Sequence, residues 1–212
     1  MIQTADQNLV RKMNTSIVLD TLRKMAPLSR AELSQHTGLN RSTVSSIVQV
    51  LLDNQLVRET ELQGDRVGRP GMLLTLNPQG GFAVGLEINV NYVAGILVDF
   101  NGDVHQQIQV PYDLNENREQ ILQKTIRLVQ ELYERVFQMG GIIFGIGVGL
   151  PGVVDIQQGT LVFAPNLGWR NLPIQKILSD QFNAPVFIEN EANCAALGEF
   201  RYGIAQGIPD FI

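Results

Sequence analysis

Small hydroxyl-bearing side chains cluster at the start of one amphipathic segment, Arg41 to about Asn54. Hydroxyl groups and a guanidinium can donate hydrogen bonds to phosphate oxygens or to base edges. A helix that carries such short side chains can enter a major groove about 12 Å wide, which bulky residues would prevent. The segment is therefore predicted to bind DNA through a polar face made of Arg41, Ser42, Thr43, Ser45 and Ser46. A solvated face on a module that binds protein or forms a dimer is the alternative.

A second basic segment, Gly64 to Gly71, is rich in glycine and also holds proline. These residues keep the chain slim and partly extended, and Arg66 and Arg69 supply positive charge. A narrow minor groove attracts such arginines. We therefore expect Arg66 and Arg69 to contact DNA. A flexible loop with solvated arginines would have the same composition.

Local signals predict the helices that position the polar face. Ser29 and Glu32 stand three residues apart, as in a capping box, and open a short helix that Gly38 ends. Asn40 is expected to cap the next helix. Two alternating segments, 56–62 and 72–76, then predict a hairpin. This order indicates a winged helix-turn-helix.

The residue pattern changes at the Pro/Gly cluster 77–81, from helical periodicity before it to β-branched, glycine-spaced runs after it. We predict that 77–81 is a linker between a DNA-binding domain, 1–76, and a second domain, 82–212. Residues 1–76 hold nine basic and seven acidic residues, which gives them a net charge of +2. Because the whole chain has a net charge of −5, residues 77–212 have a net charge of −7. A mildly basic domain joined to an acidic one is typical of an anion-binding module attached to a domain with another task.

Composition excludes several classes of protein. With 212 residues and 44% hydrophobic content, the chain is expected to fold, and its single cysteine excludes an internal disulfide. The first twenty residues lack the apolar core of a signal peptide. The longest apolar stretch, 141–154, is shorter than the roughly 18 residues that a spanning helix needs and is broken by Gly and Pro. We expect a cytoplasmic protein with no membrane partner.

The second domain alternates strand-like and helix-like segments. This order predicts that the second domain has an α/β fold, whereas residues 1–76 are predicted to have an α+β fold. The expected strands are 82–89, 92–99, 107–110, 142–148 and 186–189, with a hairpin over 155–163, and the expected helices are 117–139, 173–182 and 191–202.

Several separated motifs resemble the ROK family of repressors, open reading frames and sugar kinases. In the first domain they are Leu28 to Leu33, Thr37 to Ser45, and Gly68-Arg69-Pro70; in the second they are Gly145 to Asp155, Ala164 to Trp169, and Glu189 to Glu199. The resemblance implies that the second domain is the first part of an actin-like, ribonuclease-H-type sugar domain. Within the family, the chain resembles the members that carry such a DNA-binding domain, which are of the xylose-repressor or N-acetylglucosamine-repressor type.

By the same resemblance, Gly152, Asn166, Asn190 and Glu191 would contact a sugar. Carboxylates and amides pair well with adjacent hydroxyl groups, and Gly152 would let the backbone approach the ring. Two of these residues also have ordinary structural roles. Asn166 would be a turn residue, and Asn190 would be the N-cap of the helix that starts at Glu191.

Two departures from the family's kinases argue against catalysis. The kinases carry an Asp, two glycines and a Thr in the first hairpin. This chain has Glu87, Asn89 and Val90 there, and side chains in place of the glycines would hinder the close approach of a nucleotide phosphate. Glu191 stands where the kinases place a catalytic Asp, and a displacement of about 1 Å can cost roughly a hundredfold in rate. We therefore predict a protein that is not an enzyme and has no catalytic residue.

The predicted function is a sugar-responsive transcriptional regulator, a repressor that leaves its operator when it binds xylose, glucose or an N-acetylglucosamine-type sugar. The partners would be operator DNA, the sugar and, in a full-length chain, a second copy. No cofactor is expected because the family's zinc motif is absent from the sequence, which also lacks the second half of the sugar domain and is interpreted as truncated. The alternatives are a sugar kinase with a DNA-binding domain and a protein-interaction adaptor.

Overall fold

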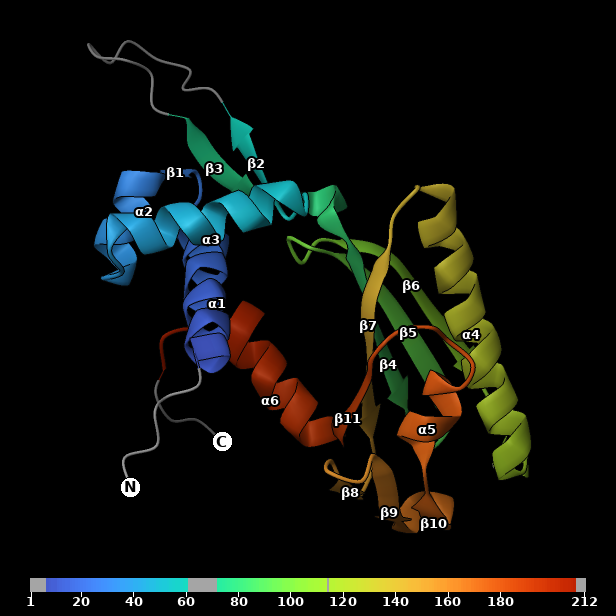
Figure 1. Cartoon of the computed structure of the whole chain (residues 1–212). Helices are drawn as coiled ribbons and strands as arrows, with labels where there is room; N and C mark the ends of the chain where they lie inside the picture. The colour runs from blue at the N-terminus through green and yellow to red at the C-terminus, as the bar shows by residue number, and fades with distance from the viewer. Residues whose placement is uncertain (1–6, 61–71, 114, 209–212) are drawn as a thin grey trace. The chain divides into compact units, whose positions relative to one another are not determined.

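The computed structural model describes residues 7–60, 72–113 and 115–208. The chain forms two compact units (Figure 1). The head comprises Met1–Gly81 and Phe100–Asp103, and the body comprises Phe82–Asp99 and Val104–Ile212. The predicted division of the chain at 77–81 would assign the short segment Phe100–Asp103 to the body, whereas in the structure it belongs to the head. This segment groups with the head because Phe100 packs against the head's hydrophobic cluster.

Three helices form most of the head, and their ends follow the local signals in the sequence. They are α1 (Gln7–Met25), α2 (Arg30–Thr37) and α3 (Arg41–Asp53). The backbone N–H of Ser29 donates to Glu32 Oε2 at 2.8 Å and the N–H of Glu32 to Ser29 Oγ at 3.3 Å, which is the predicted capping box. Gly38 ends α2 with a φ of 70°, a left-handed conformation that glycine adopts without strain.

The head also contains a small antiparallel sheet in the order β1-β3-β2. Strands β2 (Val57–Thr60) and β3 (Leu73–Leu76) pair as the predicted hairpin, with Val57 opposite Leu76. The short strand β1 (Leu28–Ser29), which pairs with β3, was not predicted. Leu28 and Leu74 face each other there and are both buried, so β1 closes one side of the head's core.

A five-stranded sheet in the order β11-β7-β4-β5-β6 is the centre of the body (Figure 1). Strands β4, β5 and β6 form an antiparallel meander, whereas β7 pairs in parallel with both β4 and β11. The parallel pairings follow from the helices in the connections, because a strand that is reached through a crossover helix returns in the same direction. The strand bounds are β4 (Phe82–Ile88), β5 (Tyr92–Asp99), β6 (Val104–Pro111), β7 (Ile143–Leu150) and β11 (Val186–Asn190).

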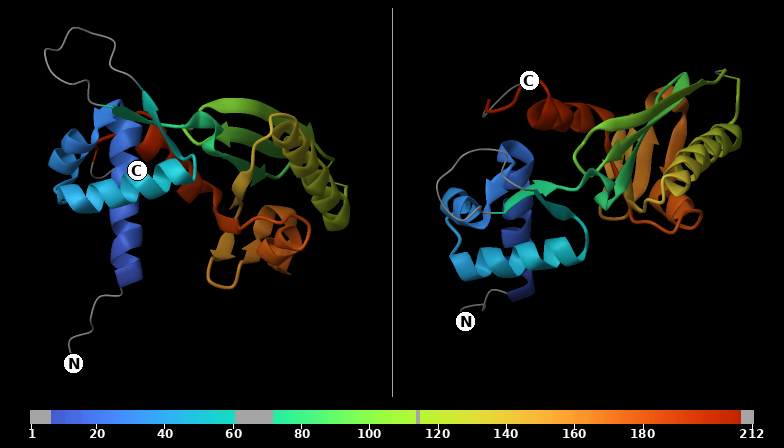
Figure 2. Two further views of the ribbon diagram at one scale, coloured as in Figure 1. Left: turned by 45° about the horizontal axis from the view of Figure 1, so that its top comes forward. Right: turned by 90° about the horizontal axis from the view of Figure 1, so that it is seen from above.

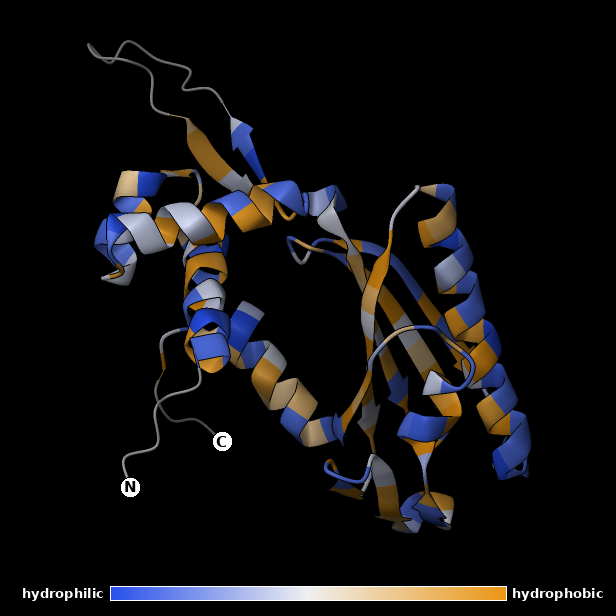
Figure 3. Cartoon of the chain, viewed as in Figure 1, coloured by the Kyte–Doolittle hydropathy of each residue, from blue (hydrophilic) through white to orange (hydrophobic). Residues whose placement is uncertain are grey.

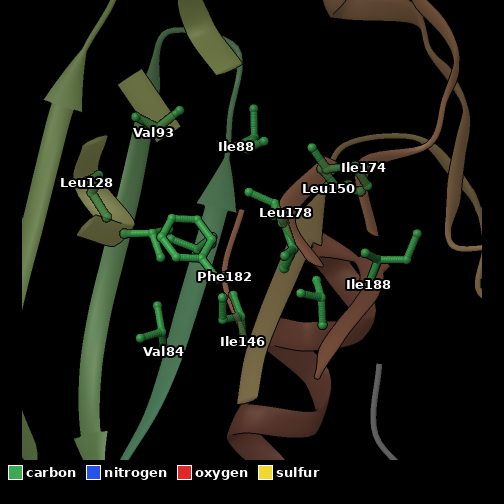
Figure 4. Packing of buried hydrophobic residues seen from close by; sticks show 14 of the residues in the cluster. Val84, Ile88, Val93, Leu128, Ile146, Leu150, Ile174, Leu178, Phe182 and Ile188 are labelled. Carbon is green, nitrogen blue, oxygen red and sulfur yellow. The ribbon is translucent and has the colours of Figure 1, made fainter. Parts of the chain in front are cut away.

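One face of this sheet is covered by α4 (Arg118–Gln138), whose apolar side faces the strands and whose polar side faces outward (Figure 3). Asn117 caps α4 in a second capping box, with Gln120 as its partner. The short helix α5 (Ile174–Ser179) and Phe182 add to the same core. Figure 4 shows Phe182 between Leu128 of α4 and Ile146 of β7, so the core is continuous from helix to sheet.

A second antiparallel sheet, β10-β9-β8, follows β7. It consists of β8 (Val153–Asp155), β9 (Thr160–Ala164) and β10 (Trp169–Leu172), of which β10 was not predicted. Trp169 and Leu172 at the ends of β10 are buried, whereas the two residues between them are exposed. The structure thus assigns Trp169 to the core of the body.

The last helix, α6 (Glu191–Tyr202), leads away from the end of β11 and has no buried residue (Figures 1 and 2). Its apolar side chains Leu197, Phe200 and Tyr202 are 59%, 42% and 65% exposed. Cys194, which also belongs to this helix, is exposed. None of the described helices combines the length and hydropathy needed to cross a membrane.

Candidate functional sites

Helix α3 separates a buried apolar face from an exposed polar face. Its buried residues are Val44, Ile47, Val48 and Leu51. On the opposite side Arg41, Ser42 and Ser46 are exposed, and Thr43 and Ser45 are half-buried. The burial of one face therefore fixes which side chains a partner of the head can reach.

The start of α3 is held by Asn40, as predicted. The Asn40 Oδ1 atom accepts hydrogen bonds from the backbone N–H of Thr43 at 2.8 Å and from the hydroxyl of Ser42 at 2.7 Å. The Ser42 hydroxyl therefore already donates its hydrogen bond within the helix start. The hydroxyl groups of Thr43 and Ser46 form no hydrogen bond with another described residue. Thr43 and Ser46 thus keep free donors on this face.

The other two residues predicted to contact DNA, Arg66 and Arg69, lie outside the described residues. Their role stays a prediction from the sequence. Strands β2 and β3, which flank them in the chain, are described and form the base of the predicted wing.

The body has a pocket of about 690 Å³ on the sheet face that is turned away from α4. Its floor includes backbone of β4 and β7 at Gly85, Gly147 and Gly149, and its wall includes the first turn of α6. Because glycines present no side chains, the floor stays open. Three carboxylates line this pocket: Glu87, Glu189 and Glu191.

The carboxylates of the pocket differ in how their oxygens are satisfied. Glu189 Oε1 accepts from the backbone N–H of Asn190 at 2.8 Å and from the Asn193 amide at 3.0 Å, and these bonds hold the pKa of Glu189 below its ordinary value. Glu191 Oε2 is buried and has no hydrogen-bond partner among the described residues. A buried carboxylate oxygen without a donor is costly, so a donor supplied by a ligand would stabilise it.

Strand β11 explains why Glu189 faces this pocket. Burial alternates along the strand, with Val186 and Ile188 on the core side and Phe187 and Glu189 on the pocket side. Glu189 was not predicted as a site residue, although the same alternation is visible in the sequence.

The hairpin between β4 and β5 is closed by its own side chains. Glu87 Oε1 accepts from the Asn89 amide at 2.6 Å and from the Tyr92 hydroxyl at 2.9 Å, and this last bond raises the pKa of Tyr92. The backbone N–H of Val90 donates to Asn89 Oδ1 at 2.6 Å, and the Tyr112 hydroxyl donates to the Asn89 carbonyl. The N–H of Val90 is therefore occupied within the hairpin.

Of the four residues predicted to contact a sugar, Glu191 lines the pocket and the others do not. Asn190 is the N-cap of α6, accepting from the N–H groups of Ala192 and Asn193, and its amide donates to the Gly152 carbonyl at 2.8 Å. This bond ties Asn190 to the connection between β7 and β8. Asn166 is exposed in the turn after β9.

Gly152 is required by packing inside the body. Its φ is +104°, and a Cβ atom there would lie 2.2 Å from the carbonyl oxygen of Phe163. The close approach that Gly152 allows in this structure is to β9.

The thiol of Cys194 faces the pocket although the residue as a whole is exposed. The pKa of the Cys194 thiol is raised, mainly because the sulfur is buried and to a smaller extent because Glu189 and Glu87 are negatively charged. The thiol therefore stays protonated at neutral pH and is a poor nucleophile. Among the described residues, no group of three His, Cys, Asp or Glu side chains is placed to hold a metal ion.

Comparison with known proteins assigns both units. Residues 83–212 match the ROK family, and residues 12–66 match the MarR family. The chain belongs to the ROK family. It is 37% identical to the xylose repressor of Bacillus spizizenii over 203 residues, which cover 95% of this chain and 52% of that repressor. The chain thus spans about half the length of this ROK relative.

Two solved structures resemble the chain. One is a ROK family transcriptional regulator described as a homologue of the Escherichia coli MLC protein, with a TM-score of 0.76 and 22% identity over 91% of this chain and 49% of its own. The other is a ROK family glucokinase from Streptomyces griseus in complex with glucose and AMPPNP, with a TM-score of 0.53 and 31% identity over 60% of this chain and 38% of its own. The predicted fold, a winged helix-turn-helix followed by the first part of a ROK domain, is confirmed.

Proposed function

We propose that this ROK protein is a DNA-binding regulator of transcription, a repressor that responds to a sugar. The single observation that carries the proposal is the polar face of α3, which leaves Arg41, Ser42 and Ser46 exposed at the start of a capped helix. In helix-turn-helix proteins this part of the second helix meets base edges in the major groove. Thr43 and Ser45 complete the proposed contact surface, with Arg66 and Arg69 reaching a minor groove.

The sugar is proposed to bind in the pocket of the body. The unpartnered Glu191 Oε2 supports this proposal, because a sugar hydroxyl would donate the hydrogen bond that it lacks. Asn190 and Gly152 are connected to each other beside Glu191 and are proposed to complete the sugar contacts together with Asn166. Xylose is the first sugar to test, since the relative at 37% identity is named a xylose repressor; glucose and N-acetylglucosamine are the next.

The body is proposed to bind its sugar without phosphorylating it. In the first hairpin Asn89 and Val90 carry side chains, and the Val90 N–H is bonded to Asn89. A phosphate cradle needs free backbone N–H groups, so this hairpin is a poor site for a nucleotide. Glu191, one methylene longer than Asp, is proposed to act as a hydrogen-bond acceptor.

Repression would use two copies of the protein on a palindromic operator. Sugar would favour a conformation whose two heads no longer match the spacing of the half-sites, so that DNA affinity falls by the coupling free energy between the two sites. A regulator works where its operator lies, and the proposal therefore includes a cytoplasmic location.

The DNA part is tested by fluorescence anisotropy with a duplex from the region upstream of the chain's own gene. Ser46→Glu should weaken binding at least about tenfold, because a carboxylate on α3 repels phosphates. Ser16→Glu is the matched control, since Ser16 is an exposed serine of the same unit on α1. Equal effects of the two substitutions, or no DNA binding by the unchanged chain, would contradict the proposal.

The sugar part is tested by calorimetric titration with xylose, glucose and N-acetylglucosamine. Glu191→Gln should weaken binding of the preferred sugar about tenfold, because a charged acceptor is lost. Glu134→Gln, at an exposed position of α4, should leave it unchanged. Production of ADP from ATP in the presence of a sugar, abolished by Glu191→Gln, would establish the kinase alternative instead.

A further inference from the structure

A groove of about 430 Å³ runs along the head between the N-terminal part of α1 and the start of α3. The polar residues that line it come from both helices: Gln7, Arg11 and Asn14 from α1, and Ser42, Thr43 and Ser46 from α3. The α1 residues are spaced by four and three positions, so they share one face of that helix. The polar face of α3 therefore continues across the groove onto α1.

The groove suits an anion. Arg11 is the one charged residue among those that line it, and no Asp or Glu does. The side chains of Arg11, Asn14, Thr43 and Ser46 form no hydrogen bond or ion pair with another described residue. Elsewhere on α1 the basic residues Arg23 and Lys24 are paired with Asp20. Arg11 thus has no partner among the described residues of the head, and its donors are available to an anion.

We propose that Arg11, supported by Asn14, binds a phosphate of the DNA backbone beside the groove that α3 enters. The inference rests on the proposed DNA binding by α3. A helix with its side chains is about 10–12 Å across, close to the width of the major groove. An element beside the inserted helix cannot share that groove, so its side chains meet the phosphates at the groove's edge.

The experiment compares Arg11→Gln with Lys12→Gln in the full chain. Lys12 carries the same charge at the next position of α1 and does not line the groove. Binding is measured by anisotropy over a range of salt concentrations, with the upstream-region duplex and with an unrelated duplex of equal length. Circular dichroism confirms that both variants keep their helices, as expected at exposed positions.

Arg11→Gln should weaken binding to both duplexes by a similar factor, about tenfold, and should reduce the slope of log affinity against log salt by about one. Lys12→Gln should change affinity less than about twofold. Equal losses in the two variants would overturn the inference, as would a loss in Arg11→Gln confined to one duplex. If Ser46→Glu abolishes DNA binding while Arg11→Gln behaves like Lys12→Gln, the proposed role of Arg11 is wrong and the proposed DNA binding by α3 stands. If the unchanged chain binds neither duplex, the proposed function itself is wrong.

Discussion

The head and the body use their apolar residues differently. In the head, three helices and a small sheet enclose a core that includes Leu33 and Val44, each fully buried. In the body, α4 covers one face of the large sheet, whereas the other face carries the glycine-floored pocket, and α6 buries none of its residues. Among the described residues, those of the head bury their apolar faces in one core, whereas the body leaves the pocket face of its sheet and α6 exposed.

The two units therefore differ in how a ligand could be held. The head exposes polar donors on a helix whose other face is anchored in a core, so the proposed DNA-binding surface is held rigidly. The pocket of the body has a sheet for its floor and only the first turn of α6 for one wall. Ligand sites usually bury most of the ligand. The affinity of this pocket therefore depends more on what covers it than the affinity of the head does.

The largest expected effect separates the two cores. Leu132→Ala in the body and Leu33→Ala in the head remove fully buried side chains, and each should lower the unfolding free energy of its own unit by about 3 kcal/mol. The single Trp, Trp169, lies in the body, so its fluorescence reports the unfolding of that unit, and circular dichroism reports both. Leu197→Ala, at an exposed position of α6, is the control.

In urea, Leu132→Ala should move the fluorescence transition, and Leu33→Ala should move only a part of the dichroism signal. Equal shifts of both signals in both variants would mean that head and body unfold together.

A smaller effect is expected at Gly152, where the body is most tightly constrained. Gly152→Ala would force a Cβ against the backbone of β9 at a positive φ, and we expect a loss of about 2 kcal/mol from the body. Trp169 fluorescence in a urea titration measures it. Gly168→Ala is a useful control, since its φ of 66° is also positive but nothing lies within 4 Å of the added Cβ. If both variants lose equally, the contact with β9 has no effect.

Two of the asparagine caps, one from each unit, allow a direct comparison. Asn40 caps α3, which has a buried face, and Asn190 caps α6, which has none. Asn40→Ala should lower the unfolding free energy of the head by about 1 kcal/mol. Asn190→Ala should loosen α6 and its bond to Gly152 with a smaller change in the unfolding midpoint of the body. Circular dichroism during denaturation measures both, and a larger loss for Asn190→Ala would show that α6 is part of the cooperative core.

The smallest effect is a dependence on pH. Hydrogen bonds hold the pKa of Glu189 below its ordinary value, and in the head the Lys24 ammonium does the same for Asp20. Because both pKa values are lowered in the folded state, this stability is present above the ordinary carboxyl pKa and is lost as pH falls through the lowered one.

Glu189→Gln should therefore reduce the acid sensitivity of the body, and Asp20→Asn that of the head, in denaturation measured between about pH 5 and 3. Salt at about 0.5 M should weaken only the Asp20 effect, since that residue is in a partly exposed ion pair with Lys24. An equal response of both variants to salt would contradict this distinction.

Local signals were sufficient to predict where α2 begins and ends and where α3 begins. The capping box at Ser29, the left-handed Gly38 and the cap at Asn40 all depend on neighbours within a few residues, and each was confirmed. The long strands and α4 were also predicted, because their periodicity is strong. The strands β1 and β10 were missed because they are short and acquire their order from pairing with distant strands.

The candidate site in the body was less predictable. The resemblance to ROK proteins led to Glu191, which lines the pocket, but not to Glu189. The apolar side chains of α6 are exposed in the structure. Periodicity shows that a helix has an apolar side, and it does not show whether another element covers that side. Only the arrangement of the sheet and α6 determines this.

The order of the elements, the polar face of α3 and the ROK motifs could be predicted from the sequence, because spacing and side-chain type act over short distances along the chain. The fold was needed to show that Arg11 of α1 lines one groove with Ser46, and that Glu87, Glu189 and Glu191 line one pocket. These side chains come from separate elements, and the packing of the two cores determines which of them meet.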